Sequence, residues 1–139
     1  MKKRAGSENE SPAFRRGKKV REQVLGRKHV ERARNAQTDL DADFQTFITE
    51  TAWGSVWARP GLDLRTRHLI TIGILAALGR EQELKLHLSS IQNTGTTWDD
   101  VREALMHVAI YAGIPAANSA ITAAKQIMAG HSNVEGANG

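Results

Sequence analysis

Residues 53–87 read WGSVWARPGLDLRTRHLITIGILAALGREQELKLH, and this stretch decides how we interpret the whole chain. It contains an apolar run, Leu69–Leu78, between two polar clusters. The first cluster holds tryptophans, arginines and an aspartate, and the second holds an arginine, glutamates and a histidine. Cations, aromatic rings and a Glu-x-x-x-His pair grouped around one apolar helix are typical of a small-molecule site rather than of a bare scaffold.

Helix signals recur on both sides of this stretch, whereas strand signals are almost absent because no sustained alternation of apolar and polar residues occurs. We predict an all-α domain of five or six helices. The helix from Leu64 to Leu78 is apolar nearly all round in its second half, so we expect it to be the central buried helix. The other helices are predicted at about residues 14–25, 38–57, 81–93, 97–112 and 115–129.

Capping residues and breakers set these boundaries. Thr38 with Asp41, and Thr97 with Asp100, are typical helix starts, and Arg59-Pro60-Gly61 ends the second helix. Residues 29–33 are predicted to be a short turn or linker. The polar ends, residues 1–13 and 131–139, are predicted to be flexible tails, which leaves residues 14–130 for the helical domain.

Length and composition narrow the class of protein. A chain of 139 residues supports one domain. The absence of cysteine excludes disulfides, thiolate metal sites and thiol chemistry. Neither an 18-residue apolar run nor a signal-peptide pattern occurs, so we expect a soluble, cytoplasmic protein without a membrane partner.

The net charge of +4 is unevenly distributed. Residues 1–34 hold 12 of the 19 Lys/Arg and 4 of the 15 Asp/Glu, so the remaining chain holds 7 and 11 and is mildly acidic. Nucleic-acid binding needs a basic face on the folded body, so we do not expect a nucleic-acid partner. Four of the seven remaining cations fall within residues 59–80, which indicates a local anion site.

Arg80, Glu83 and His87 stand at i, i+3 and i+7, so they share one face of their predicted helix. A carboxylate one turn from an imidazole fixes its tautomer, and histidine titrates near neutrality, which suits proton transfer. A solvated helix face is the alternative explanation, and the spacing alone favours it. A metal site is weaker still, because no third ligand is evident.

Trp53 and Trp57 stand at i, i+4 and Arg59 follows, which predicts a pocket wall with a cation at its rim, although such pairs are more often core. Arg65 and Arg67 fall in the first turn of a helix, where cations oppose the helix dipole. Binding a substrate carboxylate would explain them. His68 near that helix start and His29 in the linker are weaker candidates for the same site.

Several blocks of the chain together resemble the carboxymuconolactone decarboxylase family of the alkylhydroperoxidase-like all-α superfamily. The most specific are Trp53-Gly54…Trp57…Arg59-Pro60-Gly61-Leu62-Asp63 and Arg80-Glu81-x-Glu83-Leu84-x-Leu86-His87, within a resemblance that spans Gly17 to Ala129. Peroxidase relatives carry Cys-x-x-Cys-x-x-x-His, whereas here Arg80 and Glu83 occupy the cysteine positions. Thiol peroxidase activity is therefore excluded. His68 stands where those relatives often have a glutamate, and it departs from the small residue typical of the decarboxylases.

This resemblance implies decarboxylation of 4-carboxymuconolactone to 3-oxoadipate enol-lactone, in the protocatechuate branch of the β-ketoadipate pathway. The conjugated lactone accepts the charge left by CO2, so no cofactor or metal is expected. His87, steered by Glu83, is the expected proton donor, with Arg80 beside it. The arginines would bind the two carboxylates, and the tryptophans would wall the pocket.

Two alternatives remain open from the sequence. The first is a lyase or isomerase of the same fold that acts on another lactone or cyclic acid, which His68 would favour. The second is a non-catalytic ligand-binding or interaction protein. In either case we expect a homo-oligomer, a trimer or hexamer by resemblance, because short helices leave apolar surface that association covers.

Overall fold

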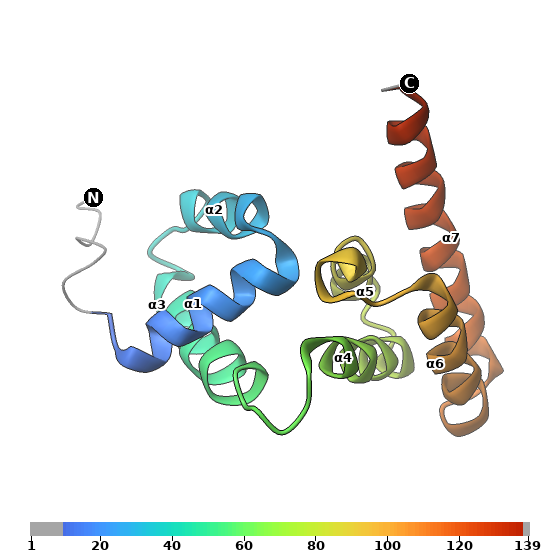
Figure 1. Cartoon of the computed structure of the whole chain (residues 1–139), viewed down its shortest axis with the longest axis horizontal. Coiled ribbons are helices and arrows are strands. Elements are labelled where there is room, and N and C mark those ends of the chain that lie inside the picture. Colours follow the sequence, from blue (N-terminus) through green and yellow to red (C-terminus); the bar gives the residue numbers. More distant parts are fainter. Residues whose placement is uncertain (1–9, 138–139) are drawn as a thin grey trace. The chain divides into compact units, whose positions relative to one another are not determined.

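The computed structural model describes residues 10–137, with side chains described as far as residue 131. Residues 10–137 contain helices and no strand, which confirms the predicted all-α class. The chain divides after Asp63 into two compact units. We call residues 10–63 the N-terminal unit and residues 64–137 the C-terminal unit, and we describe each by itself (Figure 1). Most of predicted tail 1–13 lies outside the described residues.

The N-terminal unit is built from α1 (Pro12–Leu25), α2 (Arg27–Asn35), α3 (Ala42–Ile48) and a π-helix, η1 (Thr49–Trp57). The first helix begins two residues earlier than predicted, because Ser11 Oγ accepts a hydrogen bond from the Phe14 N–H at 3.0 Å and Pro12 opens the helix. Gly26 adopts a φ of 92°, which ends α1 and lets α2 start at once.

The linker predicted at residues 29–33 is wrong, because these residues lie within α2. Two local features favour this helix. Arg27 Nε pairs with Glu31 at i+4, 3.2 Å apart, and Val30 is buried while its neighbours on the opposite side are exposed. The error arose because nine residues with one buried apolar side chain give almost no periodic signal.

The helix predicted from Thr38 to Trp57 starts later and changes type. Thr38 and Asp41 do bond to each other, with Asp41 Oδ1 accepting from the Thr38 N–H at 2.7 Å, but they form a turn and the helix begins at Ala42. From Thr49 onwards it widens into η1. The apolar side chains of Phe44 and Phe47 are exposed on this helix.

Two glycines allow α1 and η1 to pack closely. A Cβ on Gly17 would collide with the Thr49 carbonyl oxygen, and a Cβ on Gly54 would collide with that of Ala13. Arg16 Nε donates to the Gly54 carbonyl at 2.8 Å and holds the same contact from the side. This close packing fixes the position of the tryptophans on η1.

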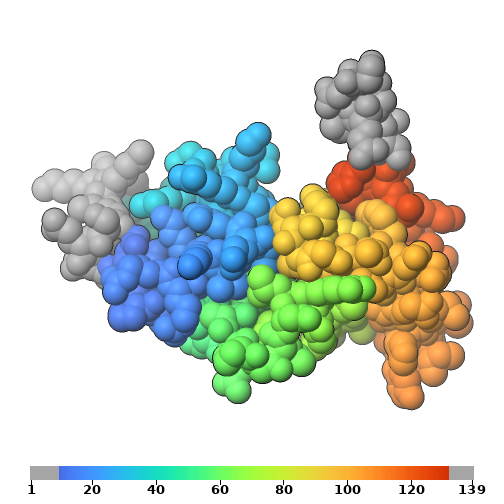
Figure 2. All heavy atoms as spheres, viewed as in Figure 1, coloured from blue at the N-terminus to red at the C-terminus, as the bar shows by residue number. Residues whose placement is uncertain are grey.

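The C-terminal unit contains α4 (Leu64–Leu78), α5 (Glu81–Leu88), a 3₁₀ turn η2 (Ile91–Thr94), α6 (Trp98–Tyr111) and α7 (Ile114–Ala137). With α1–α3, the described chain thus has seven α-helices, more than the predicted five or six. Antiparallel α6 and α7 lie side by side (Figure 1), and their atoms form one continuous surface in Figure 2. The core of this unit is apolar and consists mainly of Ile72, Ala76, Leu84, Leu88, Ile91, Val101, Leu105, Val108 and the α7 alanines.

The expectation that α4 is buried all round is wrong. Ile72 and Ala76 are buried, but Ile70, Ile74 and Leu78 on the other side are 46%, 53% and 63% exposed. A helix with one buried face needs cover from only one layer, which α6 and α7 provide. The exposed face is apolar surface of the kind that short helices were expected to leave.

Three helix boundaries in the C-terminal unit can be compared with the prediction, and one of them agrees with it. The predicted helix 81–93 ends at Leu88, because Ser89 and Ser90 donate side-chain hydrogen bonds back to the carbonyls of the last turn. The start of α6 is confirmed, since Thr97 and Asp100 form a complete capping box. The last helix continues past Gly130 to Ala137. None of the helices within residues 10–137 is long and apolar enough to span a bilayer.

Candidate active site

Two histidines meet in the interior of the C-terminal unit. His68 on α4 is completely buried and His87 on α5 is 8% exposed. His68 Nε2 lies 3.2 Å from His87 Nδ1, and the rings meet edge to face with centroids 5.2 Å apart. The sequence separated these residues by the whole of the apolar helix, and the structure brings them together.

Two threonines continue the chain of hydrogen bonds beyond His68. His68 Nδ1 lies 2.8 Å from Thr94 Oγ1 at the end of η2, and Thr94 Oγ1 lies 2.7 Å from Thr96 Oγ1. The Thr94 hydroxyl donates to the carbonyl of Ile91 at 3.1 Å. The network therefore runs from Thr96 through Thr94 and His68 to His87.

The directions of these bonds assign the proton positions. The single Thr94 hydroxyl hydrogen goes to the Ile91 carbonyl, so Thr94 Oγ1 accepts from His68 Nδ1–H. Burial lowers the pKa of His68 to about 4, so near neutrality its ring carries only this one hydrogen. His68 Nε2 is then an acceptor, and we infer that His87 Nδ1–H donates to it. The other nitrogen of His87, Nε2, is left as the one that gains and loses a proton.

The other two members of the predicted catalytic face lie differently. Glu83 is exposed, whereas His87 one turn later is buried. Arg80 immediately precedes α5, where its N–H donates to the Leu75 carbonyl at 2.9 Å, and its side chain is exposed. The ring partner given to His87 Nδ1 by the structure is His68 rather than the predicted Glu83.

Arg65 binds a carboxylate, but one that belongs to the protein. Its Nε and Nη2 donate to the two oxygens of Asp100, each at 2.8 Å, in a two-point ion pair. This pair joins the first turn of α4 to the capping box of α6, and it lowers the pKa of Asp100 to about 2. This ion pair occupies two of the Arg65 donors, and the substrate-binding role of Arg65 stays a prediction.

Arg67 is half-buried on α4, one residue before His68. Its carbonyl accepts a hydrogen bond from the Thr71 hydroxyl at 2.9 Å. Within residues 10–131 no group of three or more His, Asp or Glu side chains is arranged to hold a metal ion. The chemistry available in the C-terminal unit is thus that of a buried imidazole pair with a guanidinium on the adjoining turn.

The predicted aromatic wall lies in the N-terminal unit. Trp53 and Trp57 on η1 are 6% and 9% exposed, and their rings stack with centroids 4.9 Å apart. Arg59 follows the π-helix and is exposed. The spacing i, i+4 predicted this pair, and the wide turns of the π-helix place the two rings one above the other.

His29 lies on α2 of the N-terminal unit and is half-buried. Burial lowers its pKa, and the charges of Arg21 and Arg32 lower it further. It is therefore a neutral ring in positively charged surroundings near neutral pH.

Thr94 was not predicted as a site residue, because it lies 26 residues from His68 and no local motif joins them. The useful clue was the turn Asn93-Thr94-Gly95, whose left-handed glycine at φ 74° ends η2 and directs the chain into Thr96. A threonine flanking such a turn next to a buried helix is a common hydrogen-bond partner, but nothing in its spacing points to a histidine.

Comparison with known proteins places this geometry in context. The family model described as "Carboxymuconolactone decarboxylase family" matches residues 42–126, which includes both histidines, both tryptophans and all the threonines of the network.

Two characterised relatives share most of their length with the chain. A 4-carboxymuconolactone decarboxylase from Acinetobacter baylyi is 46% identical over 119 residues, which cover 86% of this chain and 89% of that protein. A nitrosuccinic acid decarboxylase from Metarhizium robertsii is 44% identical over 102 residues, or 73% of this chain and 71% of that protein. An uncharacterised 15.0 kDa protein from Paracoccus denitrificans is 29% identical over 84 residues, covering 59% of this chain and 63% of that protein.

Proposed function

The chain belongs to the carboxymuconolactone decarboxylase family, and from this membership we propose that it converts 4-carboxymuconolactone to 3-oxoadipate enol-lactone and CO2. The 46% identity to the Acinetobacter baylyi enzyme, over nearly the whole of both chains, supports this substrate. We place this reaction in the protocatechuate branch of the β-ketoadipate pathway and propose a cytoplasmic location for the protein.

The chemistry of this reaction makes few demands on the protein. The bond between the ring and its carboxylate breaks, and its electron pair moves into the conjugated lactone, where the carbonyl oxygen carries the charge. CO2 leaves, and a proton is then added to a ring carbon. The protein must hold two carboxylates, stabilise the enolate oxygen and deliver the proton. No electron sink beyond the lactone itself is needed.

We assign the proton delivery to His87, and the buried His68–His87 pair is the observation that carries this assignment. A neutral His68 accepts the Nδ1–H of His87 and thereby fixes the tautomer and orientation of that ring. Nε2–H of His87 is then the acid. When its proton has gone to carbon, His87 keeps the Nδ1–H tautomer, so the ring does not turn between steps.

The arginines and tryptophans have roles in substrate binding. Because Arg65 is already paired with Asp100, we assign a carboxylate of the substrate to Arg67, one residue before His68. Arg80 and Glu83 are proposed to act at the edge of the site, where both side chains are exposed. Arg59, Trp53 and Trp57 of the N-terminal unit stay proposed binding residues by family resemblance alone, with the stacked tryptophan rings as an apolar surface.

An ultraviolet assay tests the proposal directly. The purified protein is mixed with freshly generated 4-carboxymuconolactone in the presence of a chelator, with no metal or cofactor added. Rapid loss of the lactone with formation of the enol-lactone is expected. If the folded protein causes no turnover, then the substrate assignment is wrong.

A second substrate is favoured by one observation, the 44% identity to a nitrosuccinic acid decarboxylase. Nitrosuccinate is also a dicarboxylate, and its nitro group stabilises the negative charge that remains after CO2 leaves. The same protein sample is therefore assayed with nitrosuccinate. A higher kcat/KM for nitrosuccinate than for the lactone would move the function to this second acid.

We also propose that the protein forms a homo-oligomer, a trimer or hexamer by family resemblance. Apolar residues are exposed on α4 and at the α6–α7 turn, notably Ile74, Tyr111 and Ile114. A groove of about 570 Å³ runs between α4 and α6 and is lined mainly by apolar side chains. Covering it with a second copy is favourable. Sedimentation velocity tests this, and a monomer at micromolar concentration would contradict it.

A further inference from the structure

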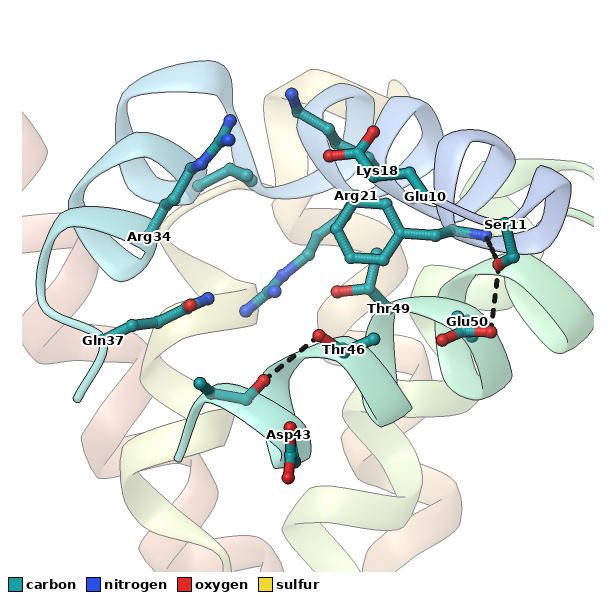
Figure 3. Close-up of a pocket in the computed structure, with 13 residues that line it drawn as sticks. Glu10, Ser11, Lys18, Arg21, Arg34, Gln37, Asp43, Thr46, Thr49 and Glu50 are labelled. Carbon is teal, nitrogen blue, oxygen red and sulfur yellow. Dashed lines mark hydrogen bonds between the residues drawn. The ribbon is translucent and has the colours of Figure 1, made fainter. Parts of the chain in front are cut away.

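The N-terminal unit contains a cavity of about 320 Å³ that none of the roles above uses (Figure 3). It lies among α1, α2, α3 and the first residues of η1. This volume is at the lower end of the range for sites that bind small molecules. All its lining residues belong to one unit, so the unit forms the cavity by itself.

Arg21 is the principal polar group of this cavity. It projects from α1, is half-buried, and donates from Nη1 to Gln45 Oε1 at 3.3 Å. Its Nε atom is completely buried and has no hydrogen-bond partner among residues 10–131. A guanidinium carries five N–H donors, and leaving a buried donor of a charged group unfilled is costly. Because Nε exposes no surface, a molecule in the cavity would have to bond to the Nη atoms of Arg21 instead.

Lys18 and Arg34 line the cavity together with Arg21, as do three acidic residues, Glu10, Asp43 and Glu50. The charge of Arg21 is felt as far as His29, whose pKa it lowers. Burial lowers the pKa of Arg21 itself, which is the direction expected of a guanidinium whose charge is not neutralised by a nearby carboxylate.

One acidic residue of the lining, Glu50, is bonded to another part of the lining. Glu50 Oε2 accepts a hydrogen bond from the Ser11 hydroxyl at 3.0 Å. In the view of Figure 3 the Arg21 guanidinium points into the space between Gln37 and Thr46, and Glu50 lies towards the other end, beside Ser11. The amide of Gln37 and the hydroxyl of Thr46 are neutral groups able to bond an anion bound there.

We propose that this cavity is an anion-binding site for a small organic dicarboxylate, with one carboxylate on Arg21 and the other reaching Lys18 or Arg34. Guanidinium and carboxylate fit each other in a two-point arrangement, and Arg21 offers Nη1 and Nη2 for it, since its Nε is closed off from the cavity. The lining residues of this site belong to the N-terminal unit, whereas His68 and His87 belong to the C-terminal unit. The proposal goes beyond the decarboxylase activity, because it concerns ligand binding without a reaction.

Adipate is the probe, and the full-length protein is titrated with it by NMR at constant ionic strength. We expect saturable shifts of backbone amides in α1, α2 and α3, and no such shifts with dimethyl adipate, which has the same chain without charge. Arg21→Gln is expected to weaken binding at least about tenfold, because a charge-assisted pair is lost. Lys19→Gln is the matched control, since Lys19 is exposed on the same helix and lies outside the cavity lining.

Two further measurements keep the outcome decisive. If Arg21→Gln fails to fold, then Arg34→Gln replaces it, because Arg34 is exposed and should be tolerated while still weakening adipate binding. The wild-type shift map stands without any variant. Adipate shifts confined to residues around His87, unsaturable shifts, or equal binding by Arg21→Gln and wild type would overturn the site.

The inference and the proposed function fail separately. Adipate binding that depends on Arg21 and persists in His87→Ala supports the cavity even if the lactone is not turned over. Turnover of the lactone without saturable adipate binding in the N-terminal unit overturns the cavity and leaves the decarboxylase assignment intact.

Discussion

The two units differ in how they bond a buried nitrogen-containing side chain, His68 in one unit and Arg21 in the other. In the C-terminal unit, the completely buried His68 is bonded at both ring nitrogens, to Thr94 and to His87. In the N-terminal unit, Arg21 is half-buried and bonded to Gln45, but its Nε lacks a partner among the described residues. Both ring nitrogens of the first side chain have partners, whereas the second side chain keeps one buried donor without a partner.

This difference separates the tasks that the two groups can perform. A ring whose bonds are all made within the protein is fixed in orientation and tautomer, which suits a group that supports proton transfer. A half-buried cation that lines a cavity gains a partner when an anion binds there, which suits binding. Adipate binding tests the role of Arg21 in the N-terminal unit, and variants of the C-terminal unit test the role of the histidine pair.

The largest expected effect is that of His87→Ala on the rate. Loss of the proton donor should lower kcat by at least about a hundredfold and up to about ten-thousandfold. The measurement is the lactone assay at neutral pH. His107→Ala is the matched control, because His107 is exposed on α6 beside Tyr111. A His87→Ala rate within a few-fold of wild type would remove His87 from the mechanism.

Next in size is the pH dependence of stability set by His68. Its pKa is about 4 in the folded chain and 6.5 in the unfolded chain, so the unfolded chain binds more protons between these values. The contribution is complete above pH 6.5 and is lost as the pH falls towards 4, by about 3 kcal/mol in total. Urea unfolding at a series of pH values measures this. His68→Gln should flatten the dependence, and an unchanged slope would show that His68 is not the group responsible.

Thr94→Val should have a smaller effect on stability. The change keeps the shape of the side chain but leaves His68 Nδ1–H buried without an acceptor, at a cost of about 1–3 kcal/mol. Thr94→Ser should retain most of the stability. Thr122→Val is the control, since that exposed hydroxyl bonds only to the Asn118 carbonyl of its own helix. Equal losses of stability in Thr94→Val and Thr122→Val would indicate that the hydrogen bond between Thr94 and His68 does not stabilise the fold.

The smallest effect concerns the Arg65–Asp100 pair. Arg65 holds the pKa of Asp100 near 2, below the ordinary 3.8, so this pair stabilises the fold above pH 4 and its contribution disappears as the pH falls to 2. Because both side chains contact solvent, the change should be small. Thermal unfolding of Arg65→Gln tests it. A destabilisation that is the same at pH 2 and pH 6 would exclude the ion pair as its cause.

The parts of the fold that the sequence predicted correctly are local. The Thr97–Asp100 capping box spans four residues, and the tryptophan pair spans five, so spacing alone reveals both. The structural class follows from the recurring helix signals in the same way. The error over α2 is also local, because too few apolar residues mark it.

The parts that the sequence could not predict depend on distant contacts. The partner of Arg65 lies 35 residues away, and that of His87 lies 19 residues away on another helix. The i, i+4 spacing predicted Glu83 as the partner of His87, because such spacing describes contacts within a single helix only. Packing of α4 against α5 and η2 brings His68 to that position instead.

The measurement that tests the account most directly is the ¹⁵N chemical shift of the ring nitrogens of His68 and His87 at neutral pH. We expect His68 to be neutral with its hydrogen on Nδ1, and His87 to carry hydrogen on Nδ1. A His68 that is protonated on Nε2, or a His87 whose Nδ1 lacks hydrogen, would contradict the assignment of His87 as a proton donor supported by a neutral His68.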